Sequence, residues 1–262
     1  MSTYSKEHLA YLKKKKRRKR WILFWQVFLL CFFLCLWEVA ASFHLINTFL
    51  ASSPSLVIKT FYSLVKNYHL FLHVAVTLYE TIISFVFVSA LGFLISILLW
   101  WHPFLAKVLD PYLTVLNSLP KVALGPLIII WVGADINSII FMALLISLFV
   151  CIINIYHDFK KTDKSYILLL ESFHASKREI FFKVVLPSNI KNIINHLKIN
   201  ISMVFIGVIM GELLVSKKGL GYLIMYGTQV FNINLVIAAI FILGTLSFSF
   251  YYLVCLFEKR FY

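Results

Sequence analysis

The sequence predicts an all-α integral membrane protein with six transmembrane helices and, on the cytoplasmic side, a helix-break-helix segment. Three observations support this fold class: the composition, the spacing of long apolar runs and the distribution of basic residues. Of the 262 residues, 61% are hydrophobic and 14% are charged, and the mean hydropathy is +0.88. Soluble domains are about 45–50% apolar and about 25% charged. A chain of this length has room for several spans of about 20 residues, and we expect no additional soluble catalytic domain.

The first 20 residues predict a basic cytoplasmic tail, and residues 21–262 a single transmembrane domain. Eight consecutive basic residues, Lys13–Arg20, directly precede the apolar stretch 21–43. That stretch is longer than the apolar core of a signal peptide, about 7–15 residues, so we expect a retained first span. Basic runs also bind nucleic acid. The position against an apolar span instead favours membrane anchoring with contacts to anionic lipid, and no nucleic-acid partner.

Five further spans are expected at about 78–101, 108–132, 136–156, 190–215 and 233–257. Small residues mark the helix faces that we expect to pack closely against neighbours. They are Ser89, Gly92 and Ser96 in the second span and Gly207 and Gly211 in the fifth.

The third span is unusual because it contains three prolines, Pro111, Pro120 and Pro126, with Asn117 and Lys121 between them. Prolines free backbone groups that lipid cannot satisfy, so this segment is expected to face protein or a water-filled cavity. We therefore expect Asn117, Pro120 and Lys121 to line a path through the membrane. Two alternatives stay open: the prolines are simple kinks, or Lys121 extends to a nearby interface.

Residues 166–187 form the longest polar-interrupted segment between the spans. Tyr166, Leu169, Leu170 and Phe173 are spaced to share one helix face. Ser176 and Glu179 match a capping box, which predicts a second helix starting near Lys177. That helix is expected to stop by Pro187, because proline disfavours helical geometry in the residue before it. An amphipathic hairpin lying on the membrane surface is the alternative.

The basic residues are distributed unevenly across this six-span layout. Twenty of the 25 lysines and arginines fall on the side that holds both termini and residues 166–187. Four fall on the other side, and Lys121 lies within a span. By the positive-inside rule, both termini and residues 166–187 are cytoplasmic.

The sequence contains no motif for catalysis or for cofactor binding. It has no phosphate-binding Gly-x4-Gly-Lys-Ser/Thr loop, no Gly-x-Ser-x-Gly and no His-Glu-x-x-His. The four cysteines lie in apolar runs without histidine or carboxylate partners at ligand spacing, so we interpret them as packing residues. We expect no enzyme, no cofactor and no metal site.

Three stretches resemble the nitrate/sulfonate/taurine-type branch of binding-protein-dependent ABC-importer permeases. The cytoplasmic loop of that family reads Glu-Ala-Ala, three residues, Gly, nine residues, Ile, one residue, Leu-Pro. Aligned on Leu186-Pro187, the chain has Val184 at the isoleucine, His174 at the glycine and Leu168-Leu169-Leu170 at Glu-Ala-Ala. The other two similar stretches are residues 119–127 with 131–133, and Glu212 followed by Gly219-Leu220-Gly221.

This resemblance implies a fold like that of type I ABC importers in the cell membrane. A cytoplasmic ATPase subunit would dock on the loop, an extracytoplasmic solute-binding protein would deliver the solute, and a second permease copy would complete a homodimer. The solute would be a small anion such as a sulfonate, taurine or nitrate, and Glu212 would lie at the outer end of the path. The family glycine also implies a positive φ at His174, and histidine is among the residues enriched there. The implied ATPase-coupling residues are Ser172, Phe173, His174, Ala175, Ser176, Lys177 and Pro187.

An ion-coupled secondary carrier that works without an ATPase is the alternative function. Such carriers usually have internal repeats and ionisable groups near the middle of the membrane. The sequence shows no convincing repeat. On the expected boundaries, the acidic residues Glu38, Glu80, Asp110, Asp135 and Glu212 all fall near span ends.

Overall fold

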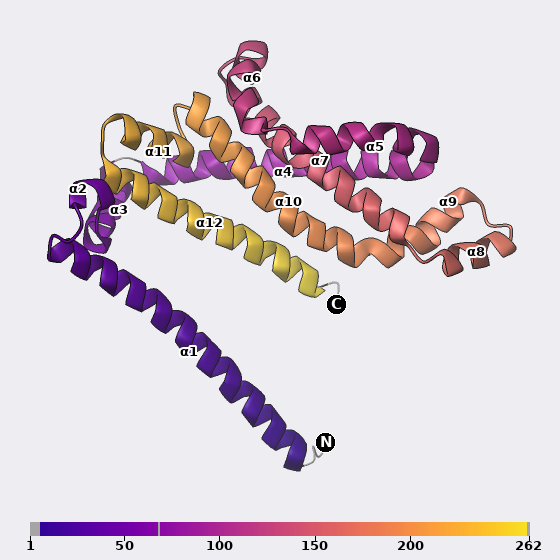
Figure 1. The fold of residues 1–262 in the computed structure, drawn as a ribbon, viewed down its shortest axis with the longest axis horizontal. Coiled ribbons are helices and arrows are strands. Elements are labelled where there is room, and N and C mark those ends of the chain that lie inside the picture. The colour runs from indigo at the N-terminus through magenta and orange to yellow at the C-terminus, as the bar shows by residue number, and fades with distance from the viewer. Residues whose placement is uncertain (1–5, 68, 261–262) are drawn as a thin grey trace. The chain divides into compact units, whose positions relative to one another are not determined.

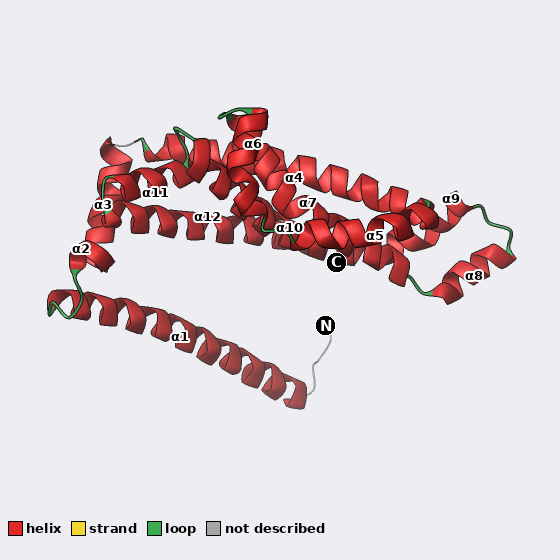
Figure 2. Cartoon of the chain, turned by 45° about the horizontal axis from the view of Figure 1, so that its top comes forward, coloured by secondary structure: helices red, strands yellow, loops and turns green. Residues whose placement is uncertain are grey.

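The computed structural model describes residues 6–67 and 69–260, and within them every regular element is a helix (Figure 2). The chain divides into two compact units, Met1–Ser63 and Leu64–Tyr262. The predicted all-α class is therefore confirmed for the described residues.

The first unit is built around one long helix, α1 (Lys6–Ser42). Its stretch Tyr11–Ser42 is long and apolar enough to cross a membrane, so the first span continues directly from the basic run. The aromatic rings of Phe24, Phe28 and Phe32 stack along one side at centroid separations of 6.2 Å. Two short helices follow, α2 (Thr48–Ala51) and α3 (Pro54–Asn67), the second of which runs into the next unit.

The second unit is a bundle whose main helices are α4, α7, α10 and α12 (Figure 1). Their bounds are Leu70–Trp101, Ile136–Lys161, Leu186–Val215 and Ile233–Arg260. Helix α7 packs along both α4 and α10, and the short helix α11 (Leu220–Gln229) packs on α12. The core between α4, α7 and α10 contains Val88, Ala143, Cys151, Val204 and Val208.

Close packing of α10 against α7 depends on the two glycines of the fifth span. A Cβ on Gly207 would lie 2.5 Å from the Cα of Ala143, and one on Gly211 would lie 2.8 Å from the Cα of Ile139. These separations are too short for any side chain, so the predicted Gly-x3-Gly contact is confirmed.

The predicted small-residue face of α4 also packs closely. A Cβ on Gly92 would lie 2.6 Å from the Sγ of Cys151 on α7. The hydroxyl of Ser96 donates a hydrogen bond to the carbonyl of Ile152 at 3.1 Å, and Ser89 accepts one from Asn200 at 3.0 Å.

The proline-rich third span is broken into pieces. Helix α5 (Pro103–Ser118) is followed by the 3-10 turn η1 (Lys121–Leu124) and helix α6 (Gly125–Val132), and the two arms meet at 83°. With this bent pair counted as one span, the described residues have the six spans that the sequence predicts.

Two predicted boundaries are wrong. The second span begins at Leu70 rather than near 78, because residues 70–77 contain no glycine or proline that would end the helix. The helix that starts at Lys177 also does not stop by Pro187, but runs on as one apolar helix to Val215.

A π-helical turn explains how this helix passes Pro187. Helix α9 (Lys177–Ile180) leads into the π segment η2 (Phe181–Val185), and α10 starts at Leu186. Pro187 thus occupies the first turn of a new α segment, where its missing N–H is tolerated. The N–H of Leu186 bonds to the carbonyl of Phe181 five residues back, and this wider turn gives the ring room.

Candidate functional site

The segment between α7 and α10 consists of two helices joined by a tight turn. Helix α8 (Lys164–Ser172) is capped by Asp163, whose Oδ1 accepts a hydrogen bond from the N–H of Ser165 at 2.8 Å. That hydrogen bond keeps the pKa of the Asp163 carboxyl below its ordinary value.

The turn after α8 is a Schellman motif centred on His174. The N–H of Ala175 donates to the carbonyl of Leu170 at 3.0 Å, and the N–H of His174 donates to the carbonyl of Glu171 at 2.9 Å. His174 has φ +57°, so the positive φ expected at this position is confirmed.

The predicted capping box is also present. The N–H of Glu179 donates to Ser176 Oγ at 3.3 Å, and the N–H of Ser176 donates to Glu179 Oε2 at 2.9 Å. These reciprocal bonds fix the start of α9 immediately after the turn.

Phe181 attaches this segment to the bundle, and the sequence analysis did not identify it. Its ring is buried. The centroid of this ring lies 5.0 Å from that of Trp100 and 5.5 Å from that of Trp101, both at the end of α4, and 5.5 Å from that of Phe159 on α7. The Lys177 ammonium bonds to the Trp101 carbonyl and lies 5.7 Å from the centroid of the Trp100 ring. A displacement of the segment must therefore also move the ends of α4 and α7, because packed aromatic rings resist sliding.

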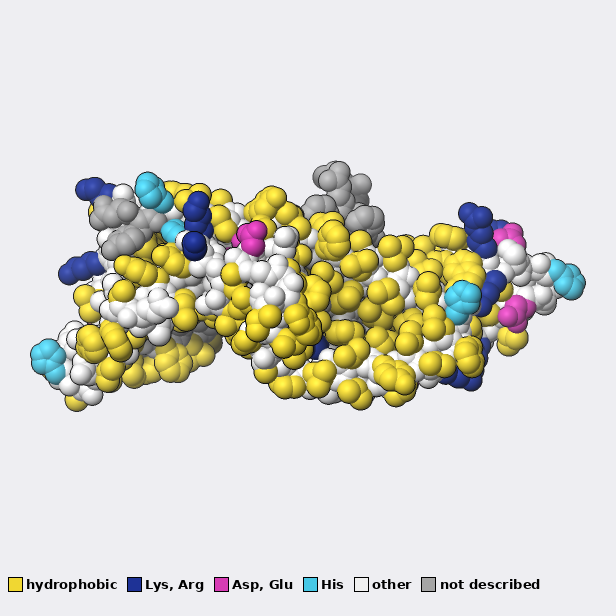
Figure 3. All heavy atoms as spheres, turned by 90° about the horizontal axis from the view of Figure 1, so that it is seen from above, with side chains coloured by type: hydrophobic (Ala, Val, Ile, Leu, Met, Phe, Trp, Pro, Cys, Tyr) yellow, Lys and Arg dark blue, Asp and Glu magenta, His cyan; other side chains and the backbone are white. Residues whose placement is uncertain are grey.

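Helix α8 and the residue that follows it expose an apolar surface to the outside of the bundle. Tyr166, Leu169 and Phe173 are 59%, 53% and 76% exposed. Leu170, expected on the same face, packs with Ala175 against the core of the bundle instead. Figure 3 shows lysine, arginine, acidic and histidine side chains gathered around the end of the bundle that carries α8 and α9, beside a broad apolar surface. We call the exposed residues Tyr166, Leu169 and Phe173 the α8 patch, and the exposed charged residues Lys164 and Glu171 lie beside them along the chain.

Asn117, Pro120 and Lys121 come together at the bend of the broken span. The Lys121 ammonium donates to Asn117 Oδ1 at 3.2 Å and to the Ile146 carbonyl of α7 at 3.3 Å, and lies 5.4 Å from the centroid of the Phe149 ring. Asn117 and Pro120 are exposed. That these three residues line a path stays a prediction.

Glu212 is located elsewhere, in a buried network at the other end of α10. It is 1% exposed, and its oxygens accept from the Thr77 hydroxyl and from the N–H of Gly221, both at 2.6 Å. The carboxylate caps α11, whose N-cap residue Gly219 has no side chain to do so. Thr77 in turn accepts from the N–H of Leu220 at 2.9 Å. The carboxylate is enclosed by α4 and the α10–α11 turn, and does not face open space.

Glu80 lies beside Glu212. The sequence analysis placed Glu80 near the end of a span, and this prediction is wrong. Because α4 begins at Leu70, Glu80 lies well inside the helix and is only 3% exposed. Its carboxyl interacts electrostatically with that of Glu212. Its Oε2 has no hydrogen-bond partner among the described residues. No sequence signal pairs these residues, because contact between them depends on α4 packing against α10.

The comparison with known proteins shows the family. The family described as the inner membrane component of binding-protein-dependent transport systems matches residues 88–261, more than half of the chain. The chain belongs to this family. The permease is therefore the membrane subunit of an ABC importer, a multi-pass inner-membrane protein, and not an enzyme. Membership also implies a separate ATPase subunit and a substrate-binding protein as partners.

Several relatives align with most of the permease. A putative aliphatic sulfonates transport permease of Bacillus subtilis is 28% identical over 242 residues, covering 91% of this chain and 88% of the relative. A formylaminopyrimidine transport permease of Halalkalibacterium halodurans is 30% identical, covering 82% and 87%. The taurine transport system permease of Escherichia coli is 22% identical, covering 90% of each.

The fold is also that of a solved importer. The permease superposes on a chain of the MetNI methionine ABC transporter, determined in inward-facing conformations, with a TM-score of 0.60 at 16% identity. The superposition covers 74% of the permease and 96% of that chain, which shows a type I importer fold.

Proposed function

We propose that two copies of this permease form the path of an importer for small anions, and that ATP-driven closure of the partner subunits reaches the path through residues 166–187. The α8 patch carries this proposal. It is an apolar surface on a segment fixed to α4 and α7 by the buried Phe181 ring. An exposed apolar patch with a polar surround is typical of a protein interface. The ATPase subunit is its proposed partner, with contacts extending along 172–177 and Pro187.

We place residues 166–187 and both termini in the cytoplasm. The twenty-to-four division of basic residues supports this orientation. The helix from Lys177 to Val215 has 39 residues, or about 58 Å at 1.5 Å per residue. Since a bilayer core is about 30 Å thick, such a helix extends well beyond it, and the Lys177 end can reach a cytoplasmic partner.

The path follows the bend of the broken span. Asn117, Pro120 and Lys121 form a polar group at a break in a span, and such backbone needs water or protein around it. A second permease copy facing this bend would supply that environment. Glu212 and the α10–α11 turn then lie toward the outer end.

The solute is proposed to be a small anion such as a sulfonate, taurine or nitrate. Relatives named for aliphatic sulfonates and for taurine support this class, although another relative is named for formylaminopyrimidine. ATPase stimulation of the reconstituted complex by a panel of these solutes tests the choice.

The coupling proposal is tested by co-purification of the ATPase with Phe173 variants. Phe173→Asp puts a charge in the α8 patch and is expected to abolish co-purification and transport. Phe173→Leu keeps an apolar contact and should retain both. Because Phe173 is 76% exposed, neither variant is expected to unfold the permease. Normal ATPase binding by Phe173→Asp would overturn the coupling proposal.

The homodimer is tested separately by native mass spectrometry of the intact complex. Two copies of the permease in that complex would support it.

A further inference from the structure

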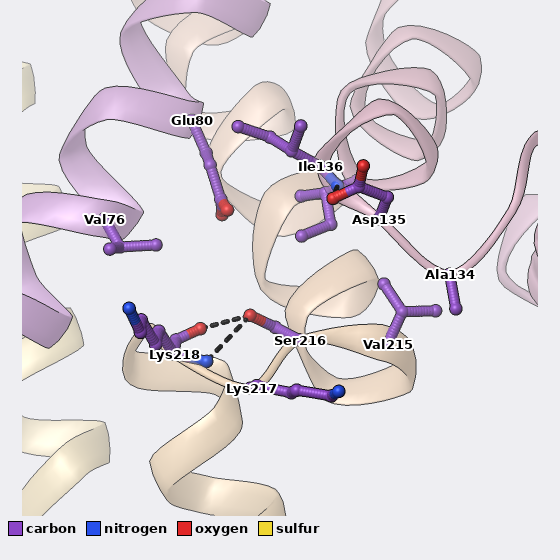
Figure 4. Close-up of a pocket in the computed structure, with 10 residues that line it drawn as sticks. Val76, Glu80, Ala134, Asp135, Ile136, Val215, Ser216, Lys217 and Lys218 are labelled. Atoms are coloured by element: carbon purple, nitrogen blue, oxygen red, sulfur yellow. Dashed lines mark hydrogen bonds between the residues drawn. The ribbon is translucent and has the colours of Figure 1, made fainter.

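A pocket lies at the end of the bundle opposite α8 and α9, between α4, the turn before α7 and the α10–α11 turn (Figures 1 and 4). Its volume is about 320 Å³, enough for a small molecule. Four ionisable side chains line it, together with apolar residues such as Val76 and Ile139. They are Glu80, Asp135, Lys217 and Lys218.

Glu80 presents an unsatisfied acceptor to this pocket. The residue is 3% exposed, its Oε2 has no hydrogen-bond partner among the described residues, and Figure 4 shows its carboxyl directed into the pocket. Buried polar atoms nearly always have a partner, so this oxygen is suited to accept a hydrogen bond from a bound molecule.

The neighbouring Glu212 determines the role of Glu80. Both oxygens of Glu212 already accept hydrogen bonds, from the Thr77 hydroxyl and the Gly221 N–H. Glu212 is thus engaged by the fold, and Glu80 Oε2 is the carboxyl oxygen left without a partner to accept a hydrogen bond from a ligand.

The other walls of the pocket carry charge. Lys217 and Lys218 lie on the turn after α10, where the N–H of Lys218 donates to Ser216 Oγ at 3.2 Å. Both lysines are exposed and none of the described acidic residues forms a salt bridge with them. Asp135 adds an exposed carboxylate. Its Oδ1 accepts a hydrogen bond from the N–H of Ile136 at 2.8 Å.

We propose that this pocket binds a small anion that also carries an ammonium group, with the acid group on Lys217 and Lys218 and an N–H of the ammonium on Glu80 Oε2. Asp135 favours an ammonium over a hydroxyl donor, because it adds negative charge on the same side as Glu80 in Figure 4. The inference rests on the proposed function, whose solute class it narrows from small anions to amino acids and aminosulfonates.

Matched pairs of probes test the proposal. Binding of taurine and ethanesulfonate, and of β-alanine and propionate, is measured by calorimetry on the full-length permease in lipid nanodiscs. Within each pair only the amino group differs. The amino member of at least one pair is expected to bind roughly tenfold more tightly, the factor that about 1.4 kcal/mol represents. Equal binding within both pairs, or no binding by any probe, would overturn the proposal.

Two variants of Glu80 separate the role of its oxygen from its role in folding. Glu80→Gln keeps a donor toward Glu212 and a carbonyl oxygen toward the pocket, so the preference for the amino probe should remain. Glu80→Leu removes the acceptor, and the two members of a pair should then bind alike. Unchanged preference in Glu80→Leu would contradict the inference. A thermal midpoint of Glu80→Leu that matches those of Glu80→Gln and wild type excludes misfolding.

The lysines are tested by the double variant Lys217→Gln, Lys218→Gln. Both members of a pair should lose affinity by the same factor, because the acid group is common to them. Unchanged affinity would show that the lysines do not bind the ligand. Since these measurements need no ATPase, their failure leaves the Phe173 co-purification test intact, and the two proposals can fail separately.

Discussion

At the scale of single residues, the α10–α11 turn shows why two glycines and a glutamate occur together. Gly219 has φ +109°, and a Cβ there would lie 2.4 Å from the carboxyl carbon of Glu212. The missing side chain of Gly219 thus makes room for the carboxylate that caps α11. A side chain at Gly221 is also excluded, because a Cβ there would lie 2.6 Å from the Cβ of Glu212.

Gly219→Ala is therefore expected to destabilise the permease. The strained φ alone costs on the order of 1–3 kcal/mol, and displacement of the Glu212 carboxylate adds to it. Thermal unfolding of the purified permease measures the effect. Gly244→Ala is the matched control, because a Cβ there meets nothing within 4 Å. Equal midpoints for the two variants would contradict this account of the turn.

His174 tests the other turn. His174→Gly should keep assembly, transport and stability close to those of wild type, because glycine adopts φ +57° without strain. His174→Val should lower the free energy of unfolding by on the order of 1–2 kcal/mol, since a β-branched residue is disfavoured at positive φ. If His174→Val unfolds at the same temperature as wild type, the positive φ at this position is not required.

At the scale of elements, the features that the sequence predicts correctly are local ones. The capping box at Ser176 depends on four consecutive residues, and the Gly207 and Gly211 face on one turn of helix. The buried hydrogen bond from Thr77 to Glu212 joins residues 135 apart, so it follows only from the packing of α4 on α10. The passage of a helix through Pro187 was also not predictable, because it depends on a π turn that has no simple sequence signature.

The attachment of α8 and α9 to the bundle can be tested by comparing two adjacent phenylalanines. Phe181→Ala leaves a cavity among Trp100, Trp101 and Phe159, and is expected to cost about 3–5 kcal/mol. Phe182→Ala removes the same group from a side chain that is 52% exposed, and should change stability by less than about 0.5 kcal/mol.

Transport and ATP hydrolysis by the assembled complex add a functional measurement. If Phe181 transmits movement, the Phe181→Leu variant should hydrolyse ATP with reduced transport per ATP, whereas Phe182→Leu should not. Unchanged coupling in Phe181→Leu would show that the ring only stabilises the fold.

At the scale of the whole molecule, the side on which each end lies stays a prediction from the distribution of basic residues. Lys177 precedes α10 and Lys217 follows it, so a single helix separates them. The sequence predicts the number of spans correctly, because apolar length is a property of the chain alone. The sequence does not predict the geometry of the broken third span, because three prolines indicate a break but do not determine the angle of 83° between its two arms.

Single cysteines at Lys177 and Lys217, in a variant lacking the four native cysteines, should be labelled from opposite sides of the membrane. An impermeant maleimide added to intact cells should modify the Lys217→Cys variant only, and the Lys177→Cys variant only after permeabilisation. Labelling of both in intact cells would overturn the six-span orientation.

The π turn at Phe181–Val185 lies between α9 and some thirty residues of uninterrupted α-helix. Those residues form an arm about 45 Å long at 1.5 Å per residue. A change of about 5° at the turn would swing the far end of this arm by about 4 Å, more than the length of a hydrogen bond. The far end is Val215, next to Glu212 and the two pocket lysines. On the proposed function, a small rotation beside the ATPase would shift this end of α10 and with it the pocket residues Val215, Lys217 and Lys218.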